Sequence, residues 1–198
     1  MTRSGLNAET PSRPSGNLRA GRFVANLIVL LISLGTIAGA LELYARLVAD
    51  DGMEFNLEMW KYAKAMKAVA GDARIGHEHV PGVRARLMGV DVAINSRKLR
   101  AREFSLEKPA NTTRILMLGD SIAFGWGVRA EETVSERLEA MLNAEGGGRY
   151  EVINAGVGNY NTDMEVGYFL GEGRQYRPDI VLLNYFVNDA EPSPRYRG

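Results

Sequence analysis

The second half of this 198-residue chain alternates between short apolar runs and amphipathic stretches. The apolar runs span residues 115–118, 152–153 and 180–187, and such short runs bounded by turn residues predict buried strands. Apolar residues between the runs recur at spacings of three and four, which is the period of a helix. The order strand, helix, strand, helix, strand predicts right-handed crossovers and a parallel sheet beginning near Thr113.

Two helices are therefore expected between the strands. The apolar stripe of the first contains Val134, Leu138, Met141 and Leu142, and the glycines at 146–148 end it. The second opens with a capping box formed by Thr162 and Glu165. We expect one face of this second helix to carry Val166, Phe169, Leu170 and Gly173.

The segment before the sheet predicts a small α+β unit. Residues 54–70 form an amphipathic helix with the stripe Phe55, Met59, Ala63, Met66 and Ala70. Alternating residues at 83–87 and 90–94, joined by Met88-Gly89, predict a β-hairpin. A basic run at 97–102 fits a solvated loop, or a contact with an anionic substrate or lipid headgroups.

The amino-terminal region contrasts with the rest. Residues 1–22 are rich in Ser, Pro, Gly, Asn and Arg, which predicts disorder. Residues 23–41 carry no charge and, as a helix, would span about 28 Å, close to the hydrocarbon thickness of a bilayer. Four preceding arginines predict a cytoplasmic amino terminus and an exported remainder. The alternative is a cleaved signal peptide, because Ala38-Gly39-Ala40 has the small-x-small form.

The composition of the chain argues against several kinds of binding site. The formal net charge is zero, with 24 basic and 24 acidic residues, which gives no support to nucleic-acid binding. The chain has no cysteine, which excludes disulfides and thiolate metal sites. We expect no cofactor and no metal ion.

Polar clusters follow the carboxyl ends of all three predicted strands. They are Gly119-Asp120-Ser121, the Gly/Asn-rich loop at 154–162, and Asn188-Asp189. In an open parallel sheet, this edge is where ligands bind. Asp120 is expected to hold its loop through backbone N–H groups, and Asn154 and Asn161 to form turns.

These three clusters resemble the sequence blocks of the SGNH/GDSL hydrolase family of serine esterases and acyl-transfer enzymes. The resemblance covers about residues 113–192 and implies that Ser121 is the nucleophile. It also implies oxyanion donors at the Ser121 N–H, the N–H of Asn159 or Gly158, and the Asn188 side chain. Gly156 and Asp189 would support the loops.

The sequence departs from the family pattern at three points. Asn159 stands where the second block has its last glycine, and Phe186 stands where a glycine precedes the third-block asparagine. The family's Asp-x-x-His block is missing, and we expect the chain to be the amino-terminal part of a longer protein. The alternative is a complete, degenerate small domain. In the first case the chain as given is expected to be inactive and to associate through its exposed third strand.

The two histidines, His77 and His79, lie upstream of the predicted nucleophile. At positions i and i+2 they could bind a metal on a strand, but two imidazoles without a third ligand make a poor site. Either could act as the base for Ser121.

Together these features predict a flavodoxin-like α/β domain with flanking helices, incomplete, after a transmembrane helix and a small α+β segment. The expected divisions are a cytoplasmic tail at 1–22, an anchor at 23–48, a pre-domain at 49–112, and the SGNH-like part at 113–198. The expected function is a membrane-anchored, single-pass serine esterase or O-acyltransferase whose catalytic part is exported from the cytoplasmic membrane. Its partners would be the lipid bilayer and an ester or acylated cell-envelope glycan. The alternative is a non-catalytic anchored module that binds a glycan or a protein.

Overall fold

The computed structural model describes residues 17–49 and 53–192, so the expectations for residues 1–16 and 193–198 lie outside the described residues. The chain divides into two compact units, Met1–Asp51 and Gly52–Gly198.

The described part of the first unit is helical. Helix α1, Asn17–Tyr44, continues into a π-helical turn at Ala45–Ala49. Within the stretch Ala20–Val48, an 18-residue window has a mean hydropathy of 2.2, and none of that window is buried within the protein. Its length and composition suit a membrane anchor or a signal sequence.

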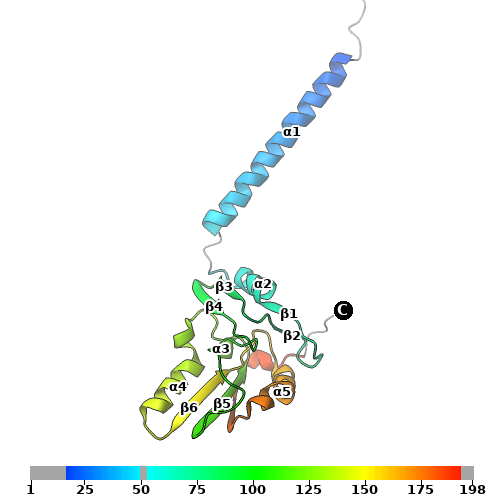
Figure 1. Ribbon diagram of the computed structural model, residues 1–198. Helices are drawn as coiled ribbons and strands as arrows, with labels where there is room; N and C mark the ends of the chain where they lie inside the picture. Colours follow the sequence, from blue (N-terminus) through cyan, green and yellow to red (C-terminus); the bar gives the residue numbers. More distant parts are fainter. Residues whose placement is uncertain (1–16, 50–52, 193–198) are drawn as a thin grey trace, which may run out of the picture. The chain divides into compact units, whose positions relative to one another are not determined.

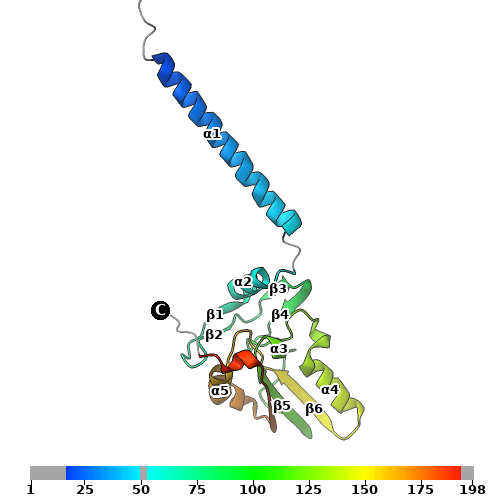
Figure 2. The same ribbon diagram turned by 180° about the vertical axis from the view of Figure 1, so that it is seen from behind.

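The second unit is built on a parallel sheet of three strands in the order β6-β5-β7 (Figure 1). The strands are β5, Thr112–Gly119; β6, Arg149–Asn154; and β7, Ile180–Asn184. Helix α4, Val134–Ala144, follows β5, and helix α5, Thr162–Gly171, follows β6. Right-handed crossovers to opposite edges of the sheet place the two helices on opposite faces, as Figures 1 and 2 show. The predicted flavodoxin-like α/β class is confirmed.

The sheet is buried unevenly. β5 lies in the centre, and its residues Ile115–Leu118 are all less than 5% exposed. β7 pairs only with β5 within the described residues, and Ile180 and Leu183 are 43% and 46% exposed. This exposure agrees with the exposed third strand expected from the sequence, and only the predicted length of the strand, 180–187, was wrong. β7 ends at Asn184, and a 3₁₀ turn follows at Val187–Ala190.

The residues before the sheet form the expected α+β pre-domain. Helix α2, Phe55–Met66, is followed by β1, Lys67–Val69, which pairs antiparallel with β2, His77–His79. The predicted hairpin is confirmed as β3, Arg84–Leu87, and β4, Val90–Ala93.

Helix α2 differs from its prediction in length and in its buried face. It ends at Met66 rather than Ala70, because the chain from Lys67 pairs with β2 as a strand. The buried side chains are Glu58, Tyr62 and Met66, and Phe55 is 53% exposed. Tyr62 and Met66 pack with Leu87, Val92, Ile94 and Phe124, which determines the face that turns inward.

Helix α5 also differs from its prediction. Its N-cap is Asn161, whose side chain accepts from the Met164 N–H at 3.0 Å, so the predicted cap at Thr162 was wrong. Val166 and Leu170 are 47% and 44% exposed, and the buried residues of the helix are Met164, Glu165, Gly167 and Tyr168. Gly167 packs closely on Arg74, where an added Cβ would lie 2.9 Å from the Arg74 Cβ.

Candidate active site

The predicted nucleophile lies on a tight turn where β5 ends. Gly119 has φ +156°, and a Cβ at that position would lie 2.6 Å from the Ala123 Cβ. The single turn α3, Ser121–Phe124, follows at once. Asp120 is fully buried and caps this turn, because its Oδ1 accepts from the Ile122 N–H at 2.8 Å. Asp120 thus has the loop-holding contact expected of it.

Ser121 is half-buried at this turn. Its Oγ donates to Asp120 Oδ2 at 3.4 Å, which is long for a hydroxyl hydrogen bond. Within residues 17–49 and 53–192, this is the only hydrogen bond of Ser121 Oγ, and no imidazole in that part of the chain bonds to it.

The third polar cluster is joined directly to the first. Asn188 Nδ2 donates to Asp120 Oδ2 at 3.1 Å, across 68 residues of sequence. Asp189 Oδ2 accepts from the Phe186 N–H at 2.6 Å, which closes the turn after β7. The expected meeting of the two strand ends therefore occurs, with Asp189 in a loop-supporting position.

The second cluster packs against the Ser121 turn. Asn154 Nδ2 donates to the Ala123 carbonyl at 2.8 Å, and Asn154 Oδ1 accepts from the Gly156 N–H at 2.9 Å. Gly156 has no room for a side chain, since an added Cβ would lie 2.3 Å from the Phe124 nitrogen. The contact requires glycine and holds the loop against α3.

The two candidate backbone donors in this loop differ. The Gly158 N–H donates to the Tyr62 hydroxyl at 3.1 Å, in a buried contact. Asn159 is exposed, has φ +68°, and its N–H has no hydrogen-bond acceptor among the described residues. Of the two groups that the sequence left open, only the Asn159 N–H is available to a ligand.

Both histidines lie on β2 and contact other groups. His79 Nε2 lies 2.6 Å from the Tyr62 hydroxyl and His79 Nδ1 lies 2.9 Å from the Lys98 carbonyl. His77 Nε2 lies 3.0 Å from the Gly158 carbonyl. Burial lowers the pKa of His77 to about 4 and that of His79 to about 3, so both are neutral near pH 7. These hydrogen bonds run to Tyr62, to Lys98 and to the second loop, rather than to Ser121.

Two residues that contact this loop were not anticipated as site residues. Lys67 donates to the Gly158 carbonyl and, at 3.0 Å, to Asn159 Oδ1. Tyr62 binds the Gly158 N–H. No sequence pattern marks either residue, because Lys67 on β1 and Tyr62 on α2 lie more than 90 residues before Gly158.

Behind the three clusters lies a buried carboxyl group. Glu165 is 1% exposed, and neither of its oxygens has a hydrogen-bond partner in the described part of the chain. Burial, and to a smaller extent the charges of Asp189 and Asp120, raises its pKa to about 7. Glu165 does not belong to a metal site, because no cluster of three metal-ligating side chains occurs among the described residues.

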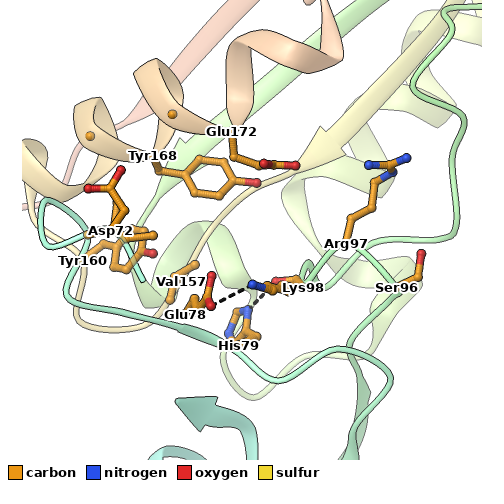
Figure 3. A pocket seen from close by; sticks show the side chains of 13 residues that line it. Asp72, Glu78, His79, Ser96, Arg97, Lys98, Val157, Tyr160, Tyr168 and Glu172 are labelled. Atoms are coloured by element: carbon orange, nitrogen blue, oxygen red, sulfur yellow. Dashed lines mark hydrogen bonds and ion pairs between the residues drawn. The ribbon is translucent and has the colours of Figure 1, made fainter. Parts of the chain in front are cut away.

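A separate cavity of about 320 Å³ lies beside the second loop, lined by residues of that loop, the pre-domain and α5 (Figure 3). Tyr168 on α5 and Glu172, the residue that follows α5, face the cavity opposite Glu78 and Lys98, which form a 2.7 Å ion pair. Ser121 and Asn188 do not line it. The cavity is thus next to the second cluster but does not contain the predicted nucleophile.

Residues 117–196 match the sequence model of the GDSL-like Lipase/Acylhydrolase family. This segment belongs to that family. The match begins inside β5, two residues before Gly119, and takes in all three polar clusters. No curated protein matches the chain. Family membership supports hydrolase-type activity in general, and the three-stranded sheet with flanking helices fits the SGNH fold of the GDSL family.

Proposed function

We propose that the protein is a serine esterase or O-acyltransferase in which Ser121 attacks the carbonyl carbon of an O-acyl ester. The observation that supports this most directly is the hydrogen bond between Asn188 and Asp120, because it places the side-chain amide of the third cluster beside the Ser121 turn. Acyl transfer requires such donors near the nucleophile, where they stabilise the developing oxyanion.

The proposed oxyanion donors are the Ser121 N–H, the Asn159 N–H and the Asn188 side-chain amide. The N–H of the first residue in a helix has no acceptor within the helix, which leaves the Ser121 N–H available. The Asn159 N–H is also available, as described above. One donor of this kind can contribute roughly 3 kcal/mol in the transition state.

We further propose that α1 anchors the protein in the cytoplasmic membrane with the GDSL domain exported. The support is the uncharged segment 23–41 of α1, which follows Arg19 and Arg22, since arginines favour the cytoplasmic side. In that location, an acylated cell-envelope glycan is the substrate class that the domain would meet.

A second candidate function is a non-catalytic module that binds a glycan or protein at the same sheet edge. The weak 3.4 Å contact of Ser121 and the absence of an imidazole bonded to it among residues 53–192 favour this candidate.

Hydrolysis of a short-chain aryl ester by the protein, purified in detergent from cells that express its own gene, separates the two. The enzyme proposal expects turnover that Ser121→Ala abolishes. Turnover that is unchanged in Ser121→Ala, or absent in both proteins, would favour the binding module.

A further inference from the structure

The peptide that joins Gly158 to Asn159 is held by side chains of the pre-domain, outside the segment that matches the family. Its carbonyl oxygen, on Gly158, accepts hydrogen bonds from Lys67 Nζ and, at 3.0 Å, from His77 Nε2. The preceding peptide is held through the Gly158 N–H, which donates to the Tyr62 hydroxyl. Lys67 comes from β1, His77 from β2 and Tyr62 from α2.

The direction of each hydrogen bond follows from the chemistry of the groups. The Lys98 carbonyl only accepts, so His79 Nδ1 carries its hydrogen, and in neutral His79 the Nε2 atom accepts from the Tyr62 O–H. The Tyr62 oxygen is then free to accept from the Gly158 N–H. His77 donates from Nε2 because its partner is a carbonyl. The whole arrangement is consistent with neutral histidines.

The hydrogen bonds to the Gly158 carbonyl affect the Asn159 N–H, which belongs to the same peptide group, in two ways. The 158–159 peptide is trans, so its N–H points in the opposite direction to its C=O, away from Lys67 and His77. Hydrogen bonds to a carbonyl, one of them from an ammonium group, also polarise the peptide and strengthen its N–H as a donor.

The same loop is fixed to the nucleophile turn. The Val157 N–H donates to the Gly119 carbonyl at 3.0 Å, and Gly156 packs on the backbone of Ala123 and Phe124. The loop also packs tightly against the pre-domain, because an added Cβ at Gly158 would lie 2.8 Å from the Tyr62 ring. The loop therefore lies in contact with both the pre-domain and the Ser121 turn.

The position of the Lys67 side chain does not result from an ion pair. Among the described residues it contacts no carboxylate, and its Nζ lies 4.4 Å from the centre of the Tyr62 ring. Burial lowers its pKa to about 7. Lys67 is half-buried and has no carboxylate partner among the described residues, so its hydrogen bonds to the loop point to a role other than an ion pair.

We propose that Lys67 and His77 are positioning residues that fix and polarise the 158–159 peptide so that the Asn159 N–H meets the developing oxyanion. This inference rests on the proposed function and extends it, because it assigns part of the catalytic arrangement to the pre-domain. Lys67 and His77 act through the peptide and do not touch the substrate.

The test compares kcat, KM and the melting temperature of purified variants on a short-chain aryl ester. Lys67→Met removes the donor and keeps the apolar stem, Lys67→Arg keeps a cationic donor, and Lys64→Met is the matched control. Lys64 is exposed on α2, and its Nζ lies over the Trp60 ring. We expect Lys67→Met to lower kcat at least tenfold with KM within about twofold, as removal of part of an oxyanion hole does. Lys67→Arg should recover most of the kcat, and Lys64→Met should match the parent.

A second pair keeps the test decisive if Lys67→Met does not fold. His77→Phe removes the donor to Gly158, whereas His77→Gln retains an N–H donor on a side chain of similar reach. The inference expects His77→Gln to keep a higher kcat than His77→Phe. A folded Lys67→Met protein with the parent kcat, or equal kcat in the two His77 variants, would overturn it. Failure of the proposed function is distinct, because the parent protein would then show no Ser121-dependent turnover at all.

Discussion

The side-chain amide of Asn188 donates to Asp120 Oδ2 at 3.1 Å, which joins the residue before the predicted nucleophile to the loop after β7. Asn188 Oδ1 is buried and has no partner in the described part of the chain, so the side chain is held through its nitrogen alone. The amide that carries the proposed oxyanion donor is therefore oriented by Asp120.

Asn188→Ala should lower kcat by a factor on the order of 10² to 10³, because one oxyanion donor is lost. The cooperative unfolding transition should remain, since Asn188 is only half-buried. Ester hydrolysis and thermal melting of the purified protein measure both effects. Asn56→Ala is a suitable control, because Asn56 is an exposed residue of α2. Unchanged turnover in Asn188→Ala would show that Asn188 is not an oxyanion donor.

Glu165→Gln should raise the free energy of unfolding above pH 7. The folded pKa of about 7 exceeds the ordinary value of 4.5, so the unfolded chain loses this proton first as the pH rises. Glu165 therefore lowers stability progressively between pH 4.5 and 7, and its full cost, on the order of 1–3 kcal/mol, applies above that window. Glutamine keeps the shape and lacks the ionisation. Urea unfolding in detergent at pH 4 and pH 8 measures the difference.

The two histidines change stability in the opposite direction and provide an internal check. Their folded pKa values of about 4 and about 3 lie below the ordinary 6.5, so stability is full above pH 6.5 and falls as the pH drops through those values. This loss is common to the parent and Glu165→Gln and cancels in their difference. A Glu165→Gln protein that is less stable than the parent at pH 8 would mean that a cationic group holds the carboxylate.

The α1 helix should retain the protein in the membrane with the GDSL domain outside the cytoplasm. Protease added to intact spheroplasts should digest the protein beyond about residue 50 and spare the amino-terminal tail, since four arginines precede the apolar segment. Immunoblotting against an amino-terminal tag detects the fragment that remains after digestion. Protection of the Ser121 region would contradict this topology, and release of the protein into the soluble fraction would favour a cleaved signal.

The sequence predicted the parallel sheet and its polar edge because both depend on local patterns. The cluster Gly119-Asp120-Ser121 lies at the end of a buried strand. The connection from a strand to the following helix determines the position of this cluster at the edge of the sheet. The hairpin was predictable for the same reason, since Met88 and Gly89 form its turn between two alternating runs.

The contacts of the pre-domain with the site could not be predicted in this way. Lys67 and Tyr62 meet Gly158 across more than 90 residues, and neither belongs to a pattern that marks chemistry. The prediction of the length of α2 was wrong for a related reason, because β1 forms only by pairing with β2. The exposed residues of β7 carry a strand pattern, but no local signal tells a central strand from an edge strand.

The central claim is that Ser121 is the nucleophile, and reaction with a fluorophosphonate tests it most directly. The protein, extracted in detergent from cells that express its own gene, is treated with the probe and digested, and the modified peptide is identified by mass spectrometry. Our account predicts a single phosphonyl adduct on Ser121, absent in Ser121→Ala and formed more slowly in Asn188→Ala. An adduct on another residue, or no adduct in the folded parent protein, would contradict it.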